Sequence, residues 1–234
     1  YIAVGRRRET ETFVGDLEDT SEGGGAFRFI SGRYGNGKSF MIQMVRNYAM
    51  DKGFVVMDAD LAINRRLTGS KGEGLNTYRE LVRNMAVKAR PDGGAMESLL
   101  QGWLYPIMDA EGPDPKAVRA SIRRATADMS GMTFYQDFVY VLGAYAEDLM
   151  DGRDDSPAIR WFKGEYDLKS DARRDLSIAM IIGDSNWYDM VKLWAEFSVR
   201  AGMKGLVVFM DEAVVLYKIQ NLTSRSNNYE RLLT

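Results

Sequence analysis

Apolar residues recur along this chain with two different periods, which predict where strands and helices lie. Residues 26–31 (AFRFIS) and 54–60 (FVVMDAD) are short apolar runs between turn residues, typical of buried strands. Between them, the apolar side chains of residues 41–48 repeat at the helical period, and Gly53 is a natural stop. Together these segments predict strand, glycine-rich loop, helix and strand, a βαβ unit with a right-handed crossover and a parallel sheet.

The remaining pattern is mostly helical. An apolar–charged repeat over Glu9–Leu17 predicts a helix that ends in a glycine turn at residues 23–25. Residues 75–201 form a long helix-rich region whose last helix has Asn186 as its predicted N-cap and Gly202 at its end. Its stripes of Met and aromatic residues are expected to be core. Four prolines are expected to divide the region into separate helices: Pro106, Pro113, Pro115 and Pro157.

A third apolar run, residues 206–210, predicts a strand that ends in two carboxylates, Asp211 and Glu212. The tail after it resembles the start of another helix. The expected fold class is α/β, a three-layer P-loop NTPase core with a parallel sheet and a large α-helical insertion. We expect three parts: 1–74 as the first part of the core, 75–201 as the helical insertion, and 202–234 as the strand with the acidic pair and the following helix.

Composition excludes several kinds of chemistry. The 234 residues include no Cys and no His, which rules out disulfides, thiolate metal sites and histidine-based catalysis. The net charge of −2 gives no overall basic field for nucleic acid, and the arginine pairs lie beside acidic residues, as on a solvated surface. No apolar run is long enough to span a membrane, and a reducing compartment is expected. The first residues (YIAVGRRRET) resemble an internal start of a longer polypeptide, not a signal peptide.

The segment Gly32-Arg33-Tyr34-Gly35-Asn36-Gly37-Lys38-Ser39 matches the phosphate-loop pattern G-x-x-x-x-G-K-[ST] without a mismatch. Its glycines let successive backbone N–H groups face phosphate oxygens, and the helix that begins near Lys38 adds the positive end of its dipole. Lys38 is expected to reach the β- and γ-phosphates of ATP, and the Ser39 hydroxyl to coordinate Mg²⁺. We expect Phe40, the next residue, to contact the nucleotide as well. The alternative is a glycine-rich turn with an incidental Lys-Ser pair.

The acidic pair supplies what a phosphate loop requires for hydrolysis. Asp211 is expected to hold Mg²⁺, and Glu212 to orient the attacking water. The alternative is a helix N-terminus that carries favourable negative charge. Asp58 and Asp60 end the second predicted strand, where they either support the magnesium or are solvated strand ends. Lys71, in the segment GSKGEG, has the composition of a phosphate-contacting loop but no structural anchor in the sequence.

These motifs resemble the AAA+/STAND-like class of P-loop ATPases. The opening segment VGRRRE is similar to the box that precedes the first strand in initiator-like members and lies against adenine and ribose. The resemblance implies Val4, Gly5 and Arg6 as nucleotide contacts, although Arg8 departs from the usual spacing. An ordinary capping turn is the alternative. Arg225 or Arg231 would serve as an arginine acting in trans, or be an ordinary surface arginine of a helix, which is the simpler interpretation.

Longer segments resemble the ATP-binding proteins of BREX phage-defence systems, the BrxD-like group. The similar segments cover nearly the whole chain: FISGRYGNGKSF, VVMDADL, RRLTGSKGEGLNTYRELVRNM, SNWYDM and LVVFMDEAVVLYKI. The resemblance implies a cytoplasmic bacterial or archaeal ATPase that works with protein partners of a defence complex on DNA, with homo-oligomers as an option. Two departures stand out. Most of the chain separates Lys38 from Asp211, and a complete domain of this class is expected to continue after the acid-ended strand with a sensor strand, a further strand and a helical lid.

The sequence therefore predicts an Mg²⁺-dependent ATPase in which Lys38 and Glu212 are catalytic. Two alternatives stay open. One is a nucleotide-dependent interaction switch that uses the helical insertion as a docking surface and turns over little ATP. The other is a DNA-remodelling motor subunit, against which the balanced charge counts.

Overall fold

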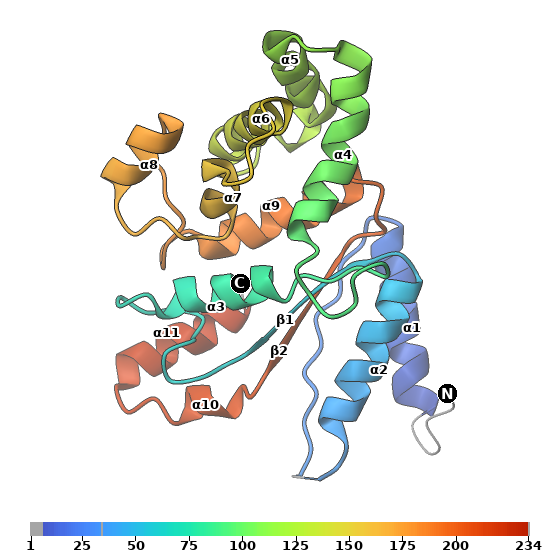
Figure 1. Ribbon diagram of the computed structural model, residues 1–234. Coiled ribbons are helices and arrows are strands. Elements are labelled where there is room, and N and C mark those ends of the chain that lie inside the picture. Colours follow the sequence, from blue (N-terminus) through green and yellow to red (C-terminus); the bar gives the residue numbers. More distant parts are fainter. Residues whose placement is uncertain (1–6, 34, 234) are drawn as a thin grey trace.

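A computed structural model describes residues 7–33 and 35–233 (Figure 1). Two parallel strands lie between helices, and all the regular structure between the two strands is helical in the described chain. The elements in chain order are α1 (Arg7–Ser21), α2 (Lys38–Asp51), β1 (Val55–Asp60), α3 (Glu73–Arg83), α4 (Met96–Glu111), α5 (Pro115–Ala125), the short 3-10 helix η1 (Ala127–Met129), α6 (Tyr135–Met150), α7 (Pro157–Phe162), α8 (Lys169–Leu176), α9 (Trp187–Arg200), β2 (Leu206–Asp211), α10 (Val214–Tyr217) and α11 (Leu222–Leu233).

The sheet confirms the α/β class and is parallel, but its strands are not the two of the predicted βαβ unit. β1 and β2 lie side by side in a register that runs from Val55 opposite Leu206 to Asp60 opposite Asp211. The two strands come from opposite ends of the sequence, yet both end in carboxylates at the same edge. The sheet thus places the acidic ends of two distant apolar runs next to each other.

Alternation along the strands gives the sheet two different faces. On one face, Val56 packs with Leu17 of α1 and with Ala49 and Met50 of α2. On the other face, Val55, Met57 and Ala59 join the large core formed with α3, α9 and the rest of the helical region. Helices therefore cover both faces, with α1 and α2 on one side and α3 and α9 on the other (Figure 1). The proposed division of the chain into three parts stays a prediction, because the helices of residues 75–201 share one core with the sheet.

The predicted strand at residues 26–31 is wrong for this structure. The segment is extended but belongs to no strand, and it leads directly to the phosphate loop. Phe27 and Phe29 are 62% and 65% exposed and contact each other edge to face, while Arg28 forms an ion pair with Asp16 of α1 at 2.7 Å. An apolar run becomes a buried strand only where a neighbouring strand and a packed face accept it, and this segment pairs with no strand and exposes both of its rings.

Two helix predictions also need correction. Pro106 lies inside α4 and does not end it. Both Pro106 and Gly102, four residues earlier, are exposed, so the carbonyl that loses its donor faces solvent. Asn186 occupies the N-cap position of α9, but its side chain does not cap the helix: it accepts a hydrogen bond from the Gly183 N–H at 2.7 Å and donates to the Ile181 carbonyl at 2.9 Å. As predicted, Pro115 and Pro157 begin α5 and α7.

The helical region is organised around buried aromatic side chains. The Trp194 ring packs against Phe138, Phe162 and Phe197, with centroid distances of 5.4, 5.3 and 5.8 Å. Tyr78 of α3 joins this cluster, where its hydroxyl donates to the Phe162 carbonyl at 2.8 Å and accepts from the Trp194 indole N–H at 3.0 Å. Burial raises the pKa of the Tyr78 hydroxyl far above its ordinary value, so the group stays neutral.

A Tyr78→Phe variant is expected to lose about 1–3 kcal/mol of unfolding free energy. The change leaves two buried groups, the Trp194 N–H and the Phe162 carbonyl, without their shared partner. Urea denaturation followed by circular dichroism measures the loss. Tyr105→Phe is the control, because Tyr105 is 52% exposed and should change stability by less than about 0.5 kcal/mol. Equal stability of the two variants would contradict the role of the Tyr78 hydroxyl.

The last helix is fastened to the loop that follows β1. Asn228 of α11 is fully buried, and its side-chain oxygen accepts from the backbone N–H groups of Leu67 and Thr68, both at 3.0 Å. Its amide donates to the carbonyl of Ser224 at 2.8 Å. The predicted helix in the tail is confirmed, and it is an integral part of the fold. Within the described chain, no helix combines the length and apolar character needed to cross a membrane.

Candidate nucleotide-binding site

The glycine-rich loop turns through two left-handed residues just before α2. Gly35 and Gly37 have φ angles of 82° and 68°, which glycine adopts without steric cost. The helix begins at Lys38, as the sequence predicts, and its first turn closes with a hydrogen bond from Met41 N–H to the Gly37 carbonyl at 3.1 Å. The loop thus leads into a helix N-terminus, the arrangement that favours phosphate.

Lys38 folds back over its own loop. Its ammonium donates to the carbonyls of Gly32 at 3.0 Å and Arg33 at 3.2 Å. Both bonds are exposed, so an anionic ligand could replace them at small cost. The lysine is therefore held within the curve of the loop, where a phosphate-binding group belongs.

A cleft of about 370 Å³ lies between α2 and the carboxyl ends of the two strands. Helix α2 contributes Ser39, Ile42, Gln43 and Arg46, which share one helical face. The strands contribute Asp58 and Asp60 from β1 and Phe209 and Asp211 from β2, and Asp92, between α3 and α4, also lines the cleft. Ser39 and Asp211, the two predicted Mg²⁺ ligands, therefore line the same cleft although most of the sequence separates them. Within the described chain, no group of three or more acidic side chains is arranged so that it could hold a metal ion.

The acidic pair at the end of β2 has an unusual backbone. Asp211 accepts the Glu212 N–H through Oδ1 at 2.7 Å, and Glu212 has a φ of 57°. A left-handed conformation costs a residue with a side chain about 1–2 kcal/mol. Such conformations are concentrated at functional sites. The Glu212 side chain is exposed and is not among the residues that line the cleft.

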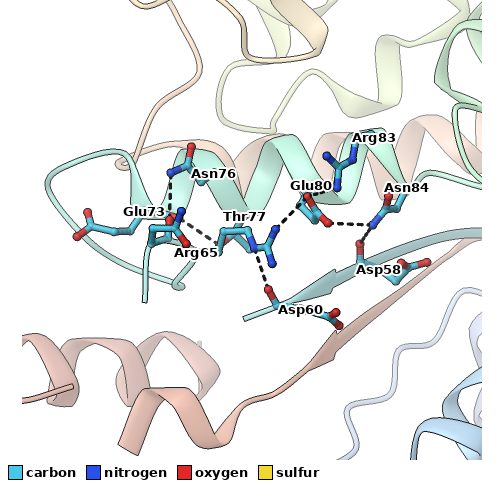
Figure 2. Close-up of polar contacts among 10 residues, drawn as sticks. Asp58, Asp60, Arg65, Glu73, Asn76, Thr77, Glu80, Arg83 and Asn84 are labelled. Carbon is cyan, nitrogen blue, oxygen red and sulfur yellow. Dashed lines mark hydrogen bonds and ion pairs between the residues drawn. The ribbon is translucent and has the colours of Figure 1, made fainter. Parts of the chain in front are cut away.

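The carboxyl end of β1 is supported from α3 and from the loop before it (Figure 2). Arg65 donates to the Asp60 carbonyl at 3.0 Å and forms an ion pair with Glu80 at 3.3 Å. Asn84 donates to the Asp58 carbonyl at 3.0 Å. These bonds engage the backbone of β1. The Asp58 carboxylate accepts from Arg46 Nε at 2.9 Å, and both Asp58 and Asp60 line the cleft. Asp58 and Asp60 are thus part of the cleft wall, and their role in supporting magnesium stays a prediction.

The loop that contains Lys71 is held by the carboxylate of Glu73, the first residue of α3. Glu73 accepts the backbone N–H groups of Lys71 at 2.7 Å and Ser70 at 3.1 Å. Partial burial opposes ionisation of Glu73, but these bonds and the charge of Arg66 outweigh it and lower the pKa of the carboxyl below its ordinary value. The Lys71 side chain is exposed and lies outside the cleft, so Lys71 remains a surface lysine here.

The other predicted contacts fall into three groups. Val4, Gly5, Arg6 and Tyr34 lie outside the described residues. Asn36 and Phe40 are exposed at the loop and the first turn of α2, with Phe40 at 60%. Arg225 and Arg231 lie on α11, over the rings of Tyr217 and Tyr188 respectively. Sequence reasoning missed Arg46, whose signal was its position seven residues after Ser39 on the same helical face.

Comparison with known proteins adds one finding. A protein-family model described as "BREX system ATP-binding protein BrxC/D" matches residues 1–234, the entire chain. No curated protein and no solved structure matches the chain. The family match confirms the resemblance carried by the segments quoted above.

Proposed function

The chain belongs to the BREX system ATP-binding protein BrxC/D family, and on this basis we propose that it binds ATP at residues 32–39 and hydrolyses it in the cytoplasm as the ATPase component of a phage-defence system. The observation that carries the proposal is the shared cleft. Ser39 at the start of α2 and Asp211 at the end of β2 line one cavity at the carboxyl edge of a parallel sheet. Nucleotides bind at this edge in open α/β sheets.

The residues present fit ATP and Mg²⁺. Two left-handed glycines open a helix, an ammonium lies within the loop, and a hydroxyl and a carboxylate face the same cleft. These are the groups that a triphosphate and a hard divalent cation prefer. Ser39 and Asp211 would hold Mg²⁺, which when bound neutralises charge on the phosphate oxygens.

Each residue of the site then has a distinct task. The loop N–H groups and the Lys38 ammonium stabilise the negative charge that develops on the γ-phosphate as water attacks. Glu212 accepts a hydrogen bond from that water and orients it. In this scheme Lys38 exchanges its bonds to Gly32 and Arg33 for phosphate oxygens, and Glu212 turns from its exposed position toward the cleft.

Beyond the site, we propose a P-loop core of the AAA+ kind that acts with protein partners of a defence complex, with DNA reached through that assembly. The helices of residues 75–201 supply the surface for partners, since they occupy the side of the sheet opposite α2 (Figure 1). Arg225 or Arg231 would be the arginine that acts in trans within such an assembly, and Val4, Gly5 and Arg6 remain predicted nucleotide contacts.

A nucleotide-dependent switch is the second candidate, and one observation favours it. Glu212 is exposed in a strained conformation and does not line the cleft. A site that binds ATP while Glu212 stays there would hydrolyse it slowly or not at all. ATP binding is common to both candidates, and turnover separates them.

A Glu212→Gln variant tests the hydrolytic role. If Glu212 orients water, the variant should bind ATP as the parent does, while turnover falls about 100-fold or more. The measurements are steady-state phosphate release and equilibrium binding of a fluorescent ATP analogue, each with Mg²⁺ and with EDTA in its place. Glu230→Gln is the matched control, an exposed acid on α11 that should leave both quantities unchanged. Parent binding without turnover would support the switch, and absence of ATP binding would refute both candidates.

A further inference from the structure

Arg46 is the one cation among the residues that line the cleft within the described chain. It lies on α2 seven residues after Ser39, so both side chains occupy the same helical face. Side chains on a helix lean toward its N-terminus, which directs Arg46 toward the phosphate-loop end of α2. Its side chain is only 12% exposed.

One nitrogen of the Arg46 guanidinium is fixed and two remain available. Nε donates to Asp58 Oδ1 of β1 at 2.9 Å. The terminal nitrogens have no hydrogen-bond partner among residues 7–33 and 35–233. Since no fully buried side-chain nitrogen or oxygen in this part of the chain lacks a partner, those nitrogens must be accessible, and the surface that Arg46 reaches is the cleft. Asp58 thus anchors the guanidinium through Nε and leaves its two terminal nitrogens without a hydrogen-bond partner in the described chain.

The charges around Arg46 show why a cation is placed there. Asp58, Asp60, Asp92 and Asp211 also line the cleft, so its walls are acidic. An anion would be repelled by this wall unless a cation compensates. A guanidinium presents paired donors in a fixed plane, the geometry that matches two oxygens of one phosphate group.

We propose that Arg46 is a phosphate-contacting residue of this site, anchored by Asp58, whose terminal nitrogens bind a phosphate group within the cleft. The inference rests on the proposed function. The phosphate has two sources with the same chemistry: the γ-phosphate of bound ATP, or the free phosphate that hydrolysis releases. Arg46 and Lys38 then contact the phosphates from two points of one helix, at its start and two turns further along.

The test is an Arg46→Gln variant assayed for ATP and ADP separately. If Arg46 binds the γ-phosphate, affinity for ATP falls about 10- to 100-fold while affinity for ADP changes less than about twofold. If it binds released phosphate, both affinities persist, but inhibition of turnover by added inorganic phosphate weakens about 10-fold. Arg46→Lys should fall between the parent and Arg46→Gln, because lysine keeps the charge and loses the paired donors.

Two further variants separate phosphate contact from a structural ion pair. Asp58→Asn breaks the pair with Arg46 but keeps the guanidinium, so it should retain most of the preference for ATP over ADP. Arg119→Gln breaks a comparable pair with Glu147 at 2.6 Å in the helical region and should retain all of it. Equal loss of ATP and ADP affinity in Arg46→Gln and Asp58→Asn, or no change in any quantity, would overturn the inference. A parent chain that binds ATP normally in those same assays would leave the proposed function standing, whereas a parent that binds neither nucleotide would refute both.

Discussion

A Lys38→Ala variant is expected to lose ATP affinity by about 100-fold, with little loss of folding stability. A charge-assisted hydrogen bond to phosphate contributes about 1.5–3 kcal/mol, and Lys38 is expected to reach two phosphate groups. Its bonds in this structure are to two exposed carbonyls, Gly32 and Arg33, which water can satisfy after the substitution. Isothermal titration calorimetry with MgATP measures the affinity, and thermal denaturation checks the fold.

Lys71→Ala is the matched control for Lys38→Ala. Both lysines adjoin a glycine in a glycine-rich segment before a helix, but the Lys71 side chain is exposed and lies outside the cleft. Its removal should change ATP affinity less than about twofold. The opposite outcome, with weakened binding in Lys71→Ala and normal binding in Lys38→Ala, would mean that the loop before α3 binds the phosphates and residues 32–39 do not.

A Trp194→Ala variant is expected to cost about 3–5 kcal/mol of unfolding free energy, the largest effect on stability that we predict. Trp194 is fully buried among three aromatic rings, so its removal leaves a large cavity. It also removes the indole N–H that the Tyr78 hydroxyl accepts. Because domains of this kind are stable by only about 5–15 kcal/mol, the loss is a large fraction of the total. Urea denaturation measures it.

Trp194→Phe keeps the prediction measurable if the alanine variant does not fold. Phenylalanine fills most of the space and loses the N–H, so the expected cost is smaller, about 1–3 kcal/mol. Tyr217→Ala is the control, because Tyr217 is 71% exposed and its loss should matter by less than about 0.5 kcal/mol. A Trp194→Ala variant as stable as Tyr217→Ala would show that the aromatic cluster is not a cooperative part of the core.

The existence of the two strands could be predicted from the sequence, but their pairing could not. Strand β1, which is mostly buried, and strand β2, which is half-buried, were each evident as a continuous apolar run that ends in an acid. Their pairing was not evident, since hydrogen bonds between strands are made by backbone atoms that are the same in every residue. The shared cleft follows from that pairing and therefore from the tertiary structure.

Residues 26–31 are a segment for which the local pattern predicted a strand that the structure does not form. The apolar run AFRFIS has the local character of a strand, but this structure leaves both phenylalanines exposed and ties Arg28 to α1. Arg46 is a further case: nothing in its neighbourhood along the chain indicates Asp58, which approaches it from β1. Long-range contacts of this kind depend on how whole helices and strands pack, so the spacing of apolar residues along the chain does not predict them.

By itself, the sequence determined the features that arise within a few residues: the left-handed glycines of the loop, the start of α2 at Lys38, the two acid-ended strands and most of the helices. These depend on backbone sterics and on the spacing of apolar side chains, which a short segment contains in full. Only the tertiary structure decided that Ser39 and Asp211 line one cleft, that Arg46 is anchored by Asp58, and that Asn228 joins the last helix to the loop after β1. Each of those contacts joins segments that come together through the burial of a common core, a property of the whole chain.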